Sequence, residues 1–144
     1  MNWKNEAIER LKRYEPMKAA AHNMIDELKE LSSKIASLKS SMAEHIAVKT
    51  SAEFNDQLLN DITRKEEMST TLLQTKTWLK STEKALGLLS PEEKLVLYRL
   101  YISRERNAID RLCTELGCEQ STVYRKRDAA LKRFTTALYG YLET

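Results

Sequence analysis

Six apolar residues in the first third of the chain follow one another at alternating spacings of four and three. They are Met24, Leu28, Leu31, Ile35, Leu38 and Met42. A repeat of this length keeps one apolar stripe on the side of a helix that faces another helix. The pattern therefore predicts a long helix in a coiled coil or a helical hairpin.

A second long helix is expected from about residue 57 to residue 86. Its apolar face is marked by Leu58, Ile62, Leu72, Leu79 and Leu86. Residues 48–56 are the best candidate for a turn, because the heptad stops there and polar side chains able to form local hydrogen bonds gather. Two long helices around a short turn suggest an antiparallel hairpin, but the same heptads could also pair in a parallel dimer. The sequence leaves both arrangements open.

Helix breakers are scarce, with 3 Gly and 2 Pro among 144 residues. Pro16 removes a backbone donor, so a kink or a new helix start is expected there. Gly87 suits a helix C-cap. Ser90, followed by Pro91 and by Glu93, has the pattern of a capping box that starts a helix. We expect an all-α chain with a hairpin or coiled coil for oligomerisation or partner binding over 1–88 and a second domain over 89–144.

Positive charge gathers near the end of the chain, although the formal net charge is only +3. Five basic residues and one acid, Asp128, fall between residues 120 and 134, which gives this segment a net charge of +4. Such a cluster on one helix is typical of a surface that meets phosphate, although a solvated helix face is the simpler alternative.

The residues before this basic segment fit a helix-turn-helix that occupies roughly 108–134. Cys113 is small where the first helix passes closest to the second, and Gly117 follows where the turn needs a left-handed backbone. Glu119 is expected to cap the second helix through its side chain. The inward positions that hold the two helices together are Leu112, Leu116, Cys118 and Val123.

The second of these helices is expected to read DNA, so residues 89–144 are expected to form a helix-turn-helix DNA-binding domain. Side chains near its start can face base edges in the major groove, where Gln suits adenine and Arg suits guanine. Basic residues further along suit phosphates, which position a protein without reading sequence. The candidate DNA-binding residues are Gln120, Ser121, Thr122, Tyr124, Arg125, Lys126, Arg127, Lys132 and Arg133.

Residues 89–134 resemble region 4 of sigma-70-type factors, in the Leu-Ser-Pro-Glu-Glu start, the Leu-Gly-Cys turn and the Ala-Leu-Lys-Arg-Phe end. The whole chain resembles small phage and prophage proteins related to the ArpU and RinA late-gene regulators. The resemblance implies promoter contacts at Gln120, Ser121 and Arg125. One position departs from the pattern, because Lys126 stands where an apolar residue is expected. The chain also lacks the promoter-melting parts of a full sigma factor.

The leading hypothesis is a phage-type transcription regulator in the cytoplasm of a bacterial host, with double-stranded DNA as partner and RNA polymerase as a second candidate. A homo-oligomer through the N-terminal helices is a further expectation. The alternatives are a DNA-packaging component similar to a terminase small subunit and a helical adaptor that binds a protein. No catalytic constellation, cofactor motif, metal site or membrane segment is found, so an enzyme is not expected.

Overall fold

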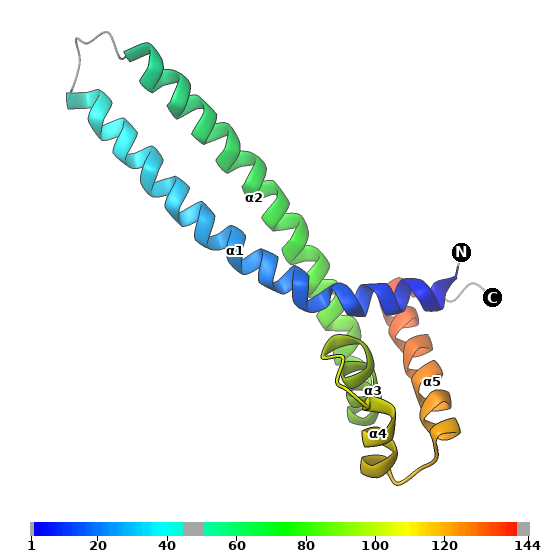
Figure 1. The fold of residues 1–144 in the computed structure, drawn as a ribbon. Helices are drawn as coiled ribbons and strands as arrows, with labels where there is room; N and C mark the ends of the chain where they lie inside the picture. Colours follow the sequence, from blue (N-terminus) through cyan, green and yellow to red (C-terminus); the bar gives the residue numbers. More distant parts are fainter. Residues whose placement is uncertain (1, 45–50, 141–144) are drawn as a thin grey trace. The chain divides into compact units, whose positions relative to one another are not determined.

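The chain is all-α in a computed structural model that describes residues 2–44 and 51–140, as the sequence predicts. Those ranges hold no strand and contain the helices shown in Figure 1. The elements are α1 (Trp3–Glu44), α2 (Ser51–Gly87), α3 (Pro91–Leu97), the π-helical segment η1 (Tyr98–Ile102), α4 (Ala108–Leu116) and α5 (Gln120–Tyr139). They form two compact units, which are treated separately below: a hairpin unit of residues 19–77 and a composite unit of residues 1–18 and 78–144.

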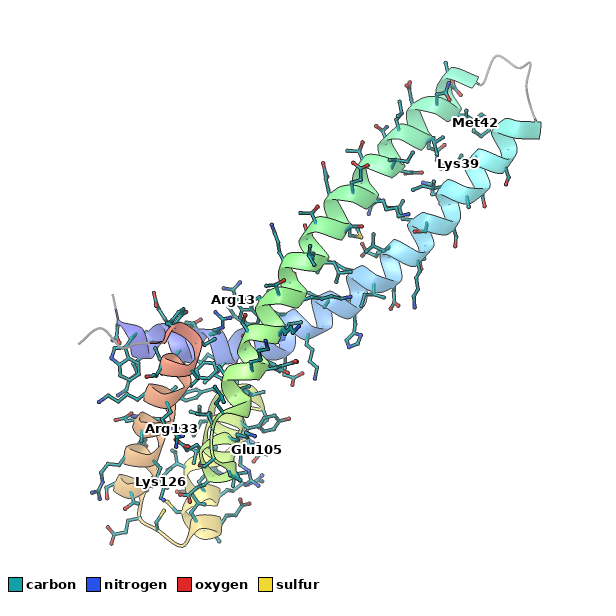
Figure 2. The ribbon with its side chains drawn as sticks, turned by 180° about the vertical axis from the view of Figure 1, so that it is seen from behind. Arg13, Lys39, Met42, Glu105, Lys126 and Arg133 are labelled. Carbon is teal, nitrogen blue, oxygen red and sulfur yellow. The ribbon has the colours of Figure 1, made fainter. Side chains whose placement is uncertain are left out.

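The hairpin unit pairs the later part of α1 with the earlier part of α2 in antiparallel order (Figure 1). Leu31, Ile35 and Leu38 of the predicted seam are buried, so the heptad faces the second helix as expected. Figure 2 shows Lys39 and Met42 near the hairpin end of α1. In this structure the two helices pair within one chain.

Helix α2 begins at Ser51, earlier than the sequence predicts. The predicted turn over 48–56 is therefore wrong for residues 51–56, which are helical, while 48–50 lie outside the described residues. Ser, Asn and Asp have low helix propensities, but a few tenths of a kcal/mol per residue are easily outweighed when a long helix packs along its length. Gly87 is the last residue of α2 and does not adopt a left-handed backbone.

The composite unit contains the start of α1, the end of α2 and the C-terminal helices. It includes residues 1–18 and 78–88, which the sequence analysis grouped with the hairpin. Its largest fully buried side chains include Leu11 of α1, Leu97 of α3 and Phe134 of α5. The start of α1 thus contributes a fully buried side chain to the same unit as α3 and α5.

Polar contacts link the start of α1 to the end of α2 within the composite unit. Arg10 donates from Nε to the hydroxyl of Thr82 at 2.9 Å, and its guanidinium lies 4.8 Å from the ring centroid of Trp78. The hydroxyl of Tyr14 donates to Glu83 at 2.7 Å. Burial, followed by the hydrogen bond to Glu83, raises the pKa of Tyr14, so this phenol stays a donor at neutral pH.

Helix α1 continues through Pro16, so the predicted new start does not occur. Proline has no N–H, and the carbonyl of Lys12 therefore loses its partner four residues along the helix. The guanidinium of Arg104 donates to that carbonyl at 3.4 Å. Arg104 itself has a left-handed backbone with φ of 49°, which a bulky residue adopts only at a cost. A distant residue thus satisfies the acceptor that Pro16 leaves free.

Helix α3 starts with the predicted capping box. The amide of Glu93 donates to the hydroxyl of Ser90 at 3.2 Å, and the amide of Ser90 donates to the Glu93 carboxylate at 2.9 Å. Pro91 occupies the first turn, where its missing N–H costs nothing. Both bonds satisfy amides that the helix start would otherwise leave unpaired.

Replacing Ile35 by Asp should destabilise the hairpin unit by about 3 kcal/mol or more, because an unpaired charge would be buried between two helices. Far-UV circular dichroism during thermal melting measures the loss. Ala36→Asp is the control, since Ala36 is exposed one residue along the same helix and should shift stability by less than about 0.5 kcal/mol. Equal melting of the two variants would show that the seam does not stabilise the unit.

Replacing Ser90 by Ala should lower the free energy of unfolding of the composite unit by about 1 kcal/mol through loss of the cap. Both tryptophans, Trp3 and Trp78, belong to this unit, so their fluorescence during urea denaturation reports on it. Ser81→Ala, on the exposed side of α2, should leave the midpoint unchanged or slightly raised. An unchanged midpoint for Ser90→Ala would contradict the stabilising role of the capping box.

Candidate nucleic-acid interface

A tight turn joins α4 to α5 at the place where the sequence predicts it. Gly117 ends α4 in the left-handed conformation, with φ of 63° and ψ of 40°. The amides of Gly117 and of Cys118 both donate to the carbonyl of Cys113, the latter at 3.1 Å. This is the hydrogen-bonding pattern of a helix end closed by a left-handed residue. The expected role of Gly117 is confirmed.

Three fully buried residues from different helices meet beside this turn. Val96 of α3, Leu112 of α4 and Val123 of α5 are each 0% exposed and pack together. The partly buried residues against them are Leu95, Leu100, Ile109, Cys113, Leu116 and Cys118. All four predicted inward positions therefore contribute to one cluster, which orients α5 relative to α3 and α4.

Glu119 starts α5 differently from the prediction. Its side chain makes no capping hydrogen bond, so the expected side-chain cap is wrong. Its backbone carbonyl instead accepts from the amides of Thr122 and Val123 at 3.0 and 3.1 Å. Its backbone is extended, as at ordinary helix starts.

The first turn of α5 is open to solvent. Gln120, Ser121 and Arg125 are exposed, Tyr124 is 41% exposed, and Thr122 is half-buried. The Gln120 amide donates to Asp110 at 3.3 Å, and the guanidinium of Arg127 lies 4.9 Å from the centroid of the Tyr124 ring. The side chains expected to meet base edges thus lie together at the exposed start of one helix.

Three of the five basic residues of α5 are already paired with carboxylates. Lys126 bonds to Glu92, and Arg133 donates to Glu93 at 3.0 Å; both carboxylates belong to the first turn of α3. Figure 2 labels both cations on α5. The hydrogen bond that Lys126 donates to Glu92 raises the pKa of Lys126 above its ordinary value, so the ammonium stays charged. These contacts tie α5 to α3.

Arg127 is the third paired cation. It contacts Asp128 at 3.0 Å, and Lys4 of α1 contacts the same carboxylate at 2.9 Å. Burial raises the pKa of Asp128, but the hydrogen bonds from Lys4 and Arg127 outweigh it and hold the pKa below the usual range. Burial likewise raises the pKa of Tyr101, against the opposing charge of Arg127.

Arg125 and Lys132 are exposed and make no ion pair with any residue in the ranges 2–44 and 51–140. They are seven residues apart, which is close to two helical turns, so they share one face of α5. Within the described part of the chain, these two are the cations of α5 that are free to meet an external anion.

Sequence reasoning did not identify the residues of α1 and α3 that pair with charged side chains of α5. The pattern around Ser90 predicted a helix start but no ion pair for Glu92 or Glu93, and nothing in the sequence indicated a partner for Lys4. Ion pairs between residues far apart in the chain leave no periodic pattern in the sequence.

No metal-binding cluster of His, Cys, Asp and Glu occurs among the described residues. No helix in those ranges combines the length and the apolar character that crossing a bilayer requires.

Comparisons with models of protein families, with curated proteins and with solved structures find no match to this chain.

Replacing Gly117 by Ala should lower the free energy of unfolding of the composite unit by about 1 kcal/mol. An added Cβ would meet no atom within 4 Å, so the cost comes from the left-handed backbone alone. Gly87→Ala is a matched control, because its Cβ also meets nothing and its backbone is not left-handed. It should be neutral or stabilising by up to about 1 kcal/mol. Equal effects in urea denaturation would show that the turn does not need glycine.

Proposed function

We propose that this chain is a phage-type transcription regulator that reads promoter or operator DNA with α5 as the recognition helix of a helix-turn-helix. The observation that carries the proposal is the exposed start of α5, placed directly after a left-handed turn on a fully buried cluster. A helix that enters the major groove needs this combination of a fixed base and a free first turn. The resemblance to sigma region 4 leads to the same reading of these residues.

The outer face of α5 has a composition that suits a groove. Side chains opposite the buried face are all exposed: Ser121, Arg125, Ala129, Lys132 and Thr136. The two unpaired cations are thus separated by Ala129 and flanked by Ser121 and Thr136, and these small side chains would let the helix approach DNA closely. The face presents donors for base edges and phosphates and has no carboxylate along its centre.

The two free cations are expected to have different roles, because they lie at different positions along α5. Arg125 lies near the start, where its planar guanidinium can pair with both acceptors of a guanine. Lys132 lies two turns further on, where a helix leaving the groove meets the phosphate backbone. Lys126 and Arg133 reach phosphate only by leaving Glu92 and Glu93.

The proposal describes a binding protein rather than an enzyme. A regulator of this kind would act in the cytoplasm of a bacterial host, and RNA polymerase would be its second partner. Both expectations are implied by the resemblance to sigma region 4. The hairpin unit would supply self-association, since Leu59 and Leu73 on α2 are 62% and 66% exposed and lie two heptads apart.

The proposal is tested by selecting bound fragments from a random DNA pool with the full chain, followed by binding measurements over a range of salt concentrations. The logarithm of the affinity should fall with the logarithm of salt at a slope of about −0.9 for each neutralised phosphate. A flat response between low and moderate salt, or no enrichment of any sequence, would contradict a DNA reader. Partner binding without DNA binding would favour the adaptor.

Arg125→Ala should lose about 1–3 kcal/mol on the selected site and relax the preference at one base pair. Lys132→Ala should weaken selected and random DNA equally and reduce the salt slope by about one unit. Lys80→Ala is the control, because Lys80 is an exposed cation on α2 and should change neither quantity. Circular dichroism verifies that each variant is folded.

Equal loss on selected and random DNA for Arg125→Ala would show that another residue of the first turn reads the bases. Gln120→Ala and Tyr124→Ala then identify that residue by a changed base preference. If none of these variants changes the preference, α5 is not a sequence reader.

A further inference from the structure

The two cysteines of the chain stand on either side of the turn that leads into α5. Cys113 lies in the last turn of α4, and Cys118 follows Gly117. The amide of Cys118 donates to the carbonyl of Cys113 at 3.1 Å. In helix ends closed this way, the side chains at these two positions commonly contact each other.

The same hydrogen bond keeps the two Cα atoms within reach of a disulfide. Standard bond lengths and the 3.1 Å contact limit their separation to about 7 Å for a straight path. The path bends at the oxygen and at the nitrogen, which brings the separation into the range of about 4.4–6.8 Å that disulfides span. The hydrogen bond therefore holds the two Cα atoms at a separation that a disulfide can span.

Both side chains also point toward the same small region. Each packs against the cluster of Val96, Leu112 and Val123, and each is half-buried rather than enclosed. Because neither residue is fully enclosed, we expect a small disulfide to reach this site. The chain has two cysteines in 144 residues, and both occupy this one contact pair, where small apolar side chains without a thiol would also serve for packing.

We propose that Cys113 and Cys118 form a dithiol modification site that closes to an intramolecular disulfide by exchange with a small disulfide of the glutathione type.

The exchange balances in two steps. One cysteine thiolate attacks a sulfur of glutathione disulfide, which forms a mixed disulfide and releases one glutathione thiolate. The second cysteine loses its proton to the medium and attacks the protein sulfur of the mixed disulfide, which releases the second glutathione. The two protein thiols are oxidised, one glutathione disulfide is reduced to two glutathiones, and the two protons end on the released thiolates.

Burial against the core, together with Cys118 and Asp110, raises the pKa of the Cys113 thiol. Exchange is therefore slow at neutral pH, and excess reduced glutathione keeps the site open. The bridge would close over residues 113–118 and stiffen the turn that directs α5. An effect on DNA binding follows only if the proposed function is correct.

The test incubates the full chain with glutathione disulfide at mildly alkaline pH and then blocks free thiols with an alkylating agent in acid. Intact mass spectrometry should show a product that has lost two hydrogens and carries neither an alkyl group nor glutathione. Cys113→Ser and Cys118→Ser should each stop at the mixed disulfide, because no second thiol can release glutathione. Reducing agent should restore two free thiols in the wild type.

The proposal is overturned if the wild-type chain accumulates the mixed disulfide as the single variants do. It is also overturned if the bridge forms between two chains, seen as a dimer on a non-reducing gel, or if both thiols stay free in excess oxidant. Circular dichroism verifies the folding of the serine variants, and the wild-type product decides the question even if a variant is unfolded.

A binding measurement with the selected DNA separates this site from the proposed function. DNA binding by the reduced chain that changes severalfold on oxidation shows that the bridge acts on α5. Binding that is equal in both forms rejects that consequence, while mass spectrometry still decides whether the bridge forms. Absence of DNA binding in both forms rejects the proposed function. Mass spectrometry then decides independently whether the disulfide forms.

Discussion

The burial of Val123 against Leu112 and Val96 is the contact on which the arrangement of α4 and α5 depends. All three side chains are fully buried. With Val123 turned inward, the helical repeat places Arg125 about 200° away, on the side facing solvent. Lys126 falls only about 60° from Val123, at the edge of the core. One buried valine thus determines which residues of α5 are presented and which are held.

The ion pair between Lys126 and Glu92 explains how a lysine is accommodated where an apolar residue is expected. Its stem can cover the core edge while its ammonium meets Glu92, and its side chain is 37% exposed. Arg133 is more open, at 62%. Ion pairs this exposed contribute little to stability, so a competing anion can displace the carboxylates from these cations. The free cations, Arg125 and Lys132, need no such exchange.

Features set by neighbours along the chain were predictable from the sequence. The seam containing Leu31 and Ile35 follows from its repeat, the start of α3 from Ser90, and the turn from Gly117. Such features depend on spacing and on backbone conformation, which local residue types determine.

Features set by residues far apart were not predictable. No local pattern indicates that residues 1–18 pack beside α5, or that Arg104 donates to the carbonyl freed by Pro16. The predicted side-chain cap at Glu119 failed for a related reason, because a suitable side chain has several possible partners. The backbone carbonyl of Glu119 accepts from two amides instead.

The position of Asp61 in the hairpin was not predictable either, because a polar residue on a long helix is usually exposed. Asp61 is buried, and its Oδ2 lies 3.4 Å from Lys34 Nζ without a hydrogen bond. A buried carboxylate stabilises little by itself, but sliding one helix by a heptad would separate it from that cation. The ion pair between Asp61 and Lys34 therefore favours one register of the hairpin, in addition to the burial of the leucines.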